Sequence, residues 1–108
     1  MSEKYYTYIL KCDDNTQYIG HTNNLENRLR AHFAGRVLYT RNKQPKLVYF
    51  ELFETRSQAY RREMQLKNGK TRKKTIQELI LDFDQAKCQG FNSHIDLLVL
   101  RTRKSSVH

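Results

Sequence analysis

The chain has 108 residues, of which 38% are apolar, and its formal net charge is +9. This length predicts one small domain with a modest core. The cationic excess favours a polyanionic partner, although a solubilising charge has the same composition. No apolar run approaches the ~20 residues of a membrane span, and no apolar signal segment follows Met1. Cys12 and Cys88 lie too far apart for a zinc-binding pair. We therefore expect a cytoplasmic, zinc-free, nucleic-acid-binding protein with no membrane partner.

Residues 5–11 and 16–20 are rich in aromatic and β-branched side chains and flank a turn-forming segment, so they predict an antiparallel hairpin. Alternation along a strand puts Tyr8 and Leu10 on one face and Ile9 on the other. Tyr18 and Gly20 also share a face. Tyr8 and Tyr18 can therefore lie together if the register allows, either as functional groups or simply as packing tyrosines.

A helix is predicted after Asn23 or Asn24, either of which can serve as its N-cap. Arg28 and His32 are four residues apart, so they lie on the same side of this helix. They border an apolar stripe made of Leu25, Leu29 and Phe33. Strand, glycine and helix would thus bring tyrosine, imidazole and guanidinium groups to one rim, which suits phosphate chemistry without proving it.

Gly35 is expected to end this helix, and a basic loop follows it. Basic residues around Tyr39 suit a nucleic-acid backbone with a stacking option, although a solvated loop has the same pattern. The loop residues that we predict to bind nucleic acid are Arg36, Arg41 and Lys43. Residues 47–53 then predict a third strand that is covered on both faces.

Thr55 and Gln58 form a capping box at the start of a helix that reaches Lys67. Glu63 falls inside the apolar arc of this helix, whose other members are Ala59, Tyr60, Met64 and Leu66. A buried carboxylate must be paired, neutralised or bound to a metal. An arginine partner and a metal ion are equally compatible with the pattern. Arg61 and Arg62 are expected to face away from the core.

The densest cationic run joins this helix to another one predicted around residues 76–83. We predict that it clamps a nucleic-acid backbone through Lys67, Lys70, Arg72, Lys73 and Lys74. Residues 1–84 are expected to form the functional domain, and residues 85–108 form a C-terminal extension. Within the extension, residues 95–100 could be a short helix or a strand, and residues 101–108 have the composition of a frayed basic tail.

The ordered set of motifs resembles the GIY-YIG nuclease family over roughly residues 5–82. Tyr6-Thr7-Tyr8 stands at the first motif, and Tyr18-Ile19-Gly20 is the second motif verbatim. Tyr6 replaces the glycine of the first motif, a change that fits a strand and spares the following tyrosine. The resemblance is completed by Arg28, His32, Glu63 and Asn68, which fall where the family carries an arginine, a histidine or tyrosine, an acidic metal ligand and an asparagine.

The resemblance implies an α+β fold with a small three-stranded antiparallel sheet flanked by helices. It implies Tyr8 as the base that activates water, with Tyr18 beside it and Arg28 on the scissile phosphate. His32 would contact the phosphate or relay a proton. Glu63 would hold a single Mg²⁺ or Mn²⁺ ion. His21 and Asn68 are additional catalytic candidates.

We therefore expect a metal-dependent endonuclease that hydrolyses DNA phosphodiester bonds. It would be structure-selective or weakly sequence-specific, would act in DNA repair or recombination, and could take further specificity from a protein partner. Two alternatives stay open. One is a nucleic-acid-binding module of the same fold with little or no turnover. The other is a basic structural protein in which Glu63 forms a salt bridge and both tyrosines pack in the core.

Overall fold

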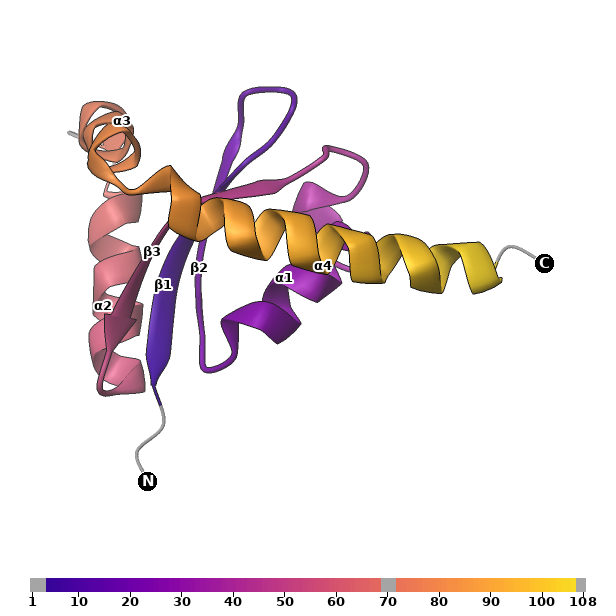
Figure 1. The fold of residues 1–108 in the computed structure, drawn as a ribbon. Coiled ribbons are helices and arrows are strands. Elements are labelled where there is room, and N and C mark those ends of the chain that lie inside the picture. The colour runs from indigo at the N-terminus through magenta and orange to yellow at the C-terminus, as the bar shows by residue number, and fades with distance from the viewer. Residues whose placement is uncertain (1–3, 69–71, 107–108) are drawn as a thin grey trace.

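The computed structural model describes residues 4–68 and 72–106, apart from the side chains of residues 72, 73 and 100–106. One antiparallel sheet has the strand order β2-β1-β3 (Figure 1). Its strands are β1 (Tyr5–Lys11), β2 (Gln17–Thr22) and β3 (Lys46–Phe53). The predicted hairpin of β1 and β2 is confirmed, and so is the α+β class with a three-stranded antiparallel sheet.

Within the described residues, four α-helices and one 3-10 turn surround the sheet. They are α1 (Leu25–Phe33), η1 (Leu38–Thr40), α2 (Arg56–Lys67), α3 (Arg72–Asp82) and α4 (Gln85–Ser106). Both predicted N-caps are present. The Asn24 side chain accepts a hydrogen bond from the Asn27 backbone N–H, and Thr55 and Gln58 form both bonds of the capping box.

Each face of the sheet packs against its own helices. Tyr8 and Leu10 point to the side covered by α1 and α4, where Leu29 packs with them. Ile9 and Ile19 point to the side covered by α2 and α3. Figure 1 shows α2 and α3 together on one side of the strands and α1 with α4 on the other. Two thin cores therefore share one sheet, and strand alternation decides which core a side chain enters.

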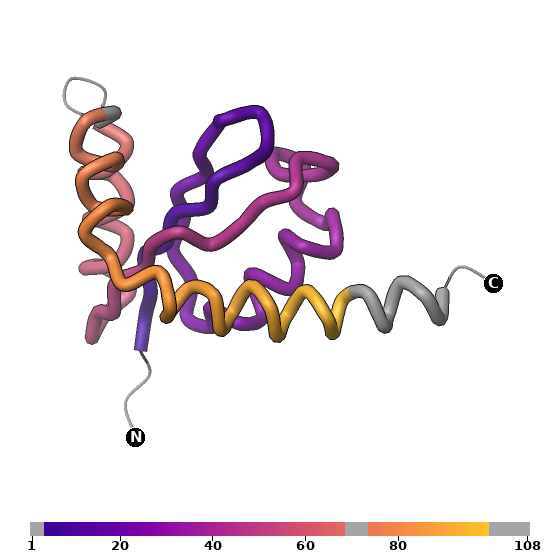
Figure 2. Tube along the Cα trace, turned by 45° about the horizontal axis from the view of Figure 1, so that its top comes forward, coloured from indigo at the N-terminus to yellow at the C-terminus, as the bar shows by residue number. Residues whose placement is uncertain are grey.

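The C-terminal helix is part of this packing. Asn92 of α4 binds both backbone groups of Leu47: its side-chain amide accepts from the N–H at 2.9 Å and donates to the carbonyl oxygen at 3.0 Å. Ile95 and Val99 are buried on the same helix face. Figures 1 and 2 both show α4 running past β3 and α1. The helix continues beyond these anchors to Ser106, where the sequence predicted a frayed tail from residue 101.

None of the helices in the described ranges combines the length and apolar character needed to span a bilayer.

Candidate active site

The two motif tyrosines meet on the face of the sheet covered by α1. Tyr8 of β1 pairs directly with Gly20 of β2, and the ring of Tyr8 lies 6.0 Å from that of Tyr18. A Cβ atom at Gly20 would lie only 2.8 Å from the Tyr8 hydroxyl oxygen and 2.9 Å from Cε1 of Tyr18. The glycine is therefore required by space: both rings lean over a position that can carry no side chain.

His32 holds the hydroxyl group of Tyr8 from the end of α1. Its side chain is only 1% exposed, and Nε2 lies 3.1 Å from the Tyr8 oxygen. On the other side of the ring, Nδ1 lies 2.8 Å from the Thr40 Oγ1 atom of η1. The Thr40 hydroxyl donates its own proton to the Val37 carbonyl oxygen, 3.5 Å away. The Thr40 oxygen can then accept a hydrogen bond from Nδ1–H of His32, which favours the tautomer of His32 with its proton on Nδ1. Nε2 is then free to accept the Tyr8 proton.

Burial controls the protonation of this pair. It raises the pKa of Tyr8, with a further increase from Tyr18, while the positive charge of Arg28 acts in the opposite direction. Burial also lowers the pKa of His32 to about 4, assisted by Arg28. At neutral pH the phenol is therefore protonated and the imidazole is neutral. His32 is buried behind Tyr8, so its contacts suit a proton relay better than direct binding of a phosphate.

Glu63 of α2 lies on the opposite face of the sheet and is 7% exposed. Its two oxygens are 2.7 Å from Nδ1 of His21 and 2.6 Å from Nζ of Lys67. The partners within the protein are thus a histidine and a lysine, whereas the sequence had left an arginine partner and a metal ion as open alternatives. His21 stands on this face because it is one residue further along β2 than Gly20. The negative charge of Glu63 contributes to the raised pKa of Tyr8, so the two groups interact electrostatically.

The residues around Glu63 are compatible with one hard divalent cation. Among the described residues, no cluster of three or more His, Cys, Asp or Glu side chains offers a dedicated metal cage. Mg²⁺ nevertheless keeps several waters and binds through one or two carboxylates plus substrate phosphates. The buried carboxylate of Glu63 already attracts the ammonium group of Lys67 to 2.6 Å. A cation with the chemistry of Mg²⁺ or Mn²⁺ fits this donor, in competition with Lys67.

Exposed aromatic rings border both parts of the site. Tyr39 of η1 is 49% exposed and lies 5.6 Å from the ring of Tyr18. Tyr60 of α2 is 50% exposed and lies 5.7 Å from the ring of His21. The assignment of Tyr60 and Met64 to the apolar arc of α2 is wrong, because both are exposed. The α2 face against the sheet is narrow, and its buried residues are Ala59, Glu63 and Leu66.

Three of the predicted nucleic-acid-binding side chains have partners within the protein. Lys67 pairs with Glu63, and Lys43 lies 3.4 Å from Asp14 and 4.6 Å from the centre of the Tyr39 ring. Arg41 donates through Nε to the Gly35 carbonyl oxygen. The other predicted residues fall into two groups: Arg36 and Lys74 are exposed, whereas the side chains of Lys70, Arg72 and Lys73 lie outside the described part.

Three further predictions, for two arginines and one asparagine, have structural outcomes. Arg28 is exposed on α1, as a phosphate ligand must be. Asn68 is the C-cap of α2 and donates its backbone N–H to the Gln65 carbonyl oxygen. Arg62, expected to face away, instead donates through Nε to Glu51 of β3 at 3.0 Å. Sequence reasoning missed Thr40, and its only sequence signal is a small hydroxyl residue inside the basic loop.

Comparison with known proteins identifies similar sequences. A sequence model described as the GIY-YIG catalytic domain matches residues 4–77. A UPF0213 protein of Clostridium perfringens is 43% identical over 94 residues, which cover 85% of this chain and 98% of that protein. A UPF0213 protein of Staphylococcus haemolyticus is 47% identical over 66 residues, covering 59% of this chain and 80% of that protein.

A solved structure is also similar. The solution structure of a UPF0213 protein from Bacillus halodurans has 30% sequence identity and a TM-score of 0.47, and the match covers 70% of this chain and 84% of that one. The sequence match of the domain model spans β1 to α3 and includes Tyr8, Gly20, His32 and Glu63. The chain belongs to the GIY-YIG family of nuclease domains.

Proposed function

We propose that this protein is a metal-dependent endonuclease that hydrolyses phosphodiester bonds in DNA. The observation that carries the proposal is the buried chain of hydrogen bonds from Tyr8 through His32 to Thr40. A pure packing role would not need a neutral imidazole directed at the hydroxyl of a buried tyrosine. The exposed guanidinium of Arg28, which influences the pKa values of both Tyr8 and His32, supports the same reading.

In the proposed reaction, a water molecule hydrogen-bonded to Tyr8 attacks the phosphorus atom. As the new P–O bond forms, the P–O bond to the leaving nucleotide oxygen breaks, and that oxygen takes a proton from solvent water. The attacking water transfers a proton to the Tyr8 oxygen as Tyr8 passes its own proton to Nε2 of His32. The imidazolium that results keeps its Nδ1–H bond to Thr40. This transfer is unfavourable in the free protein, because the pKa of Tyr8 is raised and that of His32 is lowered.

Substrate binding would act on the two pKa values with different consequences. A phosphate bound to Arg28 offsets a charge that lowers the pKa of His32 and also that of Tyr8, so it favours proton acceptance by His32 and opposes proton loss from Tyr8. Neutralising Glu63 removes a charge that raises the pKa of Tyr8. A divalent cation held by Glu63 would supply positive charge to the phosphate oxygens. Arg28 stabilises the same developing charge through bidentate hydrogen bonds.

The second candidate is a DNA-binding module with little turnover. One observation favours it: His21 and Lys67 already occupy both oxygens of Glu63. A protein that only binds nucleic acid could keep this carboxylate as a structural ion pair.

Cleavage assays on labelled duplex, nicked, branched and single-stranded DNA distinguish the two candidates. Each substrate is incubated with Mg²⁺, Mn²⁺ or chelator. Wild type is compared with Glu63→Gln and with Glu51→Gln, a matched control on β3 whose carboxylate pairs with Arg62. The proposal expects metal-dependent cleavage that Glu63→Gln abolishes and Glu51→Gln retains. Tight binding without cleavage of any substrate would contradict it in favour of the binding module.

A further inference from the structure

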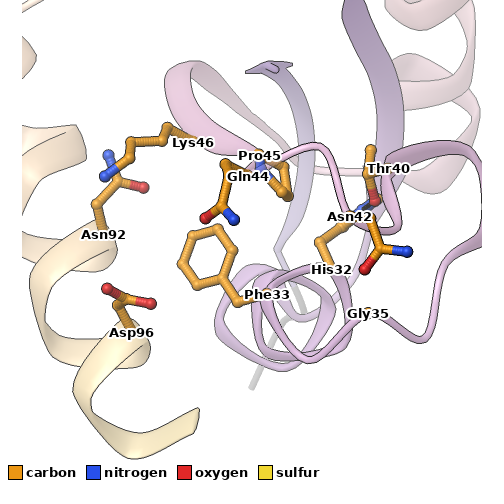
Figure 3. A pocket seen from close by; sticks show the side chains of 10 residues that line it. All are labelled: His32, Phe33, Gly35, Thr40, Asn42, Gln44, Pro45, Lys46, Asn92 and Asp96. Atoms are coloured by element: carbon orange, nitrogen blue, oxygen red, sulfur yellow. Dashed lines mark hydrogen bonds between the residues drawn. The ribbon is translucent and has the colours of Figure 1, made fainter. Parts of the chain in front are cut away.

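A cavity of about 250 Å³ lies behind His32, between the end of α1, the loop before β3 and the helix α4. Figure 3 shows the Phe33 ring in this cavity, with Gln44 and Asp96 near it and His32 towards the other side. Asp96 comes from α4, beyond residues 4–77 that match the family domain. The wall of the cavity that α4 supplies therefore lies outside the matched domain.

Polar groups without protein partners converge on the cavity. Asn92 is already engaged with the backbone of Leu47. In contrast, the side chains of Asn42, Gln44 and Asp96 form no hydrogen bond or ion pair with any described residue. Two amides and a carboxylate provide both donors and acceptors. Asn42, Gln44 and Asp96 are exposed side chains that the fold does not use, and a few such polar groups at the edge of a pocket with an aromatic wall indicate a candidate ligand site.

The backbone presents two of these side chains at a conformational cost. Asn42 has a φ of 63° and Gln44 has a φ of 53°, both in the left-handed region. Asparagine visits this region with some ease, but glutamine does so rarely. Such conformations persist where the surrounding structure enforces them, and they concentrate at ligand clamps. Here they direct two amide side chains to the border of one cavity.

The chemistry of the lining selects among possible ligands. The lining carries one carboxylate, that of Asp96, and one ammonium group, that of Lys46, so it has no excess of positive charge to select a phosphate group. The amides disfavour a purely apolar ligand. The volume equals the space of roughly eight water molecules in the liquid. A flat heterocycle with amino and carbonyl groups on its edge fits both the size and the mixed donors and acceptors. The half-buried ring of Phe33 adds an aromatic surface against which such a heterocycle can stack.

We propose that this cavity binds one unpaired nucleobase. Its wall includes His32 and Thr40, so the bound base would lie against the residues that hold Tyr8. The source of the base is either a nucleotide of the DNA strand or a free nucleoside. The strand as source rests on the proposed function, whereas the base site itself does not.

Binding measurements in chelator test this proposal independently of cleavage. The double variant Asn42→Gly/Gln44→Gly removes both amides while glycine accepts the positive φ angles. The matched control is Asn15→Gly. Asn15 lies in the β1–β2 turn with a φ of 67° and does not line the cavity. A single-stranded oligonucleotide is titrated into each protein. We expect the double variant to bind about tenfold more weakly than wild type, as the loss of two hydrogen bonds predicts. The control should stay within about twofold, because its only change is in a distant turn.

Side-chain amide signals of Asn42 and Gln44 in NMR spectra identify the ligand. If these signals shift with the single-stranded oligonucleotide but not with adenosine or cytidine, the bound base belongs to the DNA strand. If they also shift with the free nucleosides, the base alone is sufficient for binding. Unchanged affinity of the double variant, or equal shifts with inorganic phosphate, would overturn the base site. An active nuclease with either of these results would leave the proposed function intact and remove only this inference.

Discussion

Replacing Gly20 with alanine should destabilise the fold, because the added methyl group enters space that two tyrosine rings occupy. The new Cβ atom would lie 2.8 Å from the Tyr8 hydroxyl oxygen and 2.9 Å from Cε1 of Tyr18. Tyr8 has little freedom to move, since it is 1% exposed and bonded to His32. Either the phenol leaves its hydrogen bond or the two strands separate locally.

The magnitude follows from three contributions. Forcing an extra methyl group into a packed site costs about 1–3 kcal/mol. Displacing the Tyr8 hydroxyl from His32 costs about 0.5–1.5 kcal/mol more. Alanine recovers about 0.4–1 kcal/mol by restricting the unfolded chain. The net loss of about 0.5–4 kcal/mol corresponds to a fall in Tm of roughly 2–30 °C for a domain of this size.

Thermal and urea denaturation would measure this change beside a matched control. Gly90 lies in α4, and a Cβ atom there would meet nothing within 4 Å. The same substitution at Gly90 should stabilise the protein by about 0.5–1 kcal/mol through helix propensity. The two variants therefore carry the same chemical change with opposite expected signs. A Gly20→Ala protein with a Tm at or above that of wild type would refute the packing argument.

Three further results are expected. Tyr8→Phe should lower the cleavage rate at least about 100-fold. Tyr49→Phe, on the other face of the sheet, should lower it less than about threefold. Similar rates for the two variants would mean that the Tyr8 hydroxyl takes no part in the reaction. Acidification from pH 6.5 to about 4 should destabilise the fold, because His32 becomes protonated at a higher pH in the unfolded chain than in the folded one. The free energy of unfolding should fall by roughly 3 kcal/mol, and urea titrations at several pH values would measure this. Lys67→Met should raise the affinity for Mn²⁺ about tenfold, because it removes the ammonium group that competes for Glu63. Electron paramagnetic resonance of Mn²⁺ in the absence of DNA would measure this affinity, and an unchanged value would place the ion elsewhere.

Local patterns in the sequence predicted the scaffold well. Strand alternation placed Tyr8, Tyr18 and Gly20 on one face, and the structure confirms this because β1 and β2 pair without a shift through these positions. Capping chemistry placed the starts of α1 and α2, since caps depend only on residues three positions apart. Helical periodicity also identified Glu63 as a buried charge.

The partners of these residues were less accessible to sequence reasoning. Thr40 reaches His32 only because the loop after α1 folds back, and its neighbours Asn42 and Gln44 adopt positive φ angles that no periodicity encodes. The pairing of Glu63 with His21 joins residues 42 positions apart. A charge inside an apolar arc indicates that a partner exists, but only the tertiary arrangement selects which one.

The sheet is a single layer, so charged groups on one of its faces can act electrostatically on groups on the other face. Tyr8 and His32 belong to the α1 side, and Glu63 and His21 belong to the α2 side, yet Glu63 still influences the pKa of Tyr8. Under the proposed function, positive charge at Glu63 would lower the pKa of Tyr8, because the carboxylate is one of the groups that raise it. A phosphate on Arg28 would raise the pKa of both Tyr8 and His32, because Arg28 lowers both, so it would favour the proton acceptor and oppose the proton donor. The change that eases proton loss from Tyr8 itself would therefore come from the Glu63 side of the sheet.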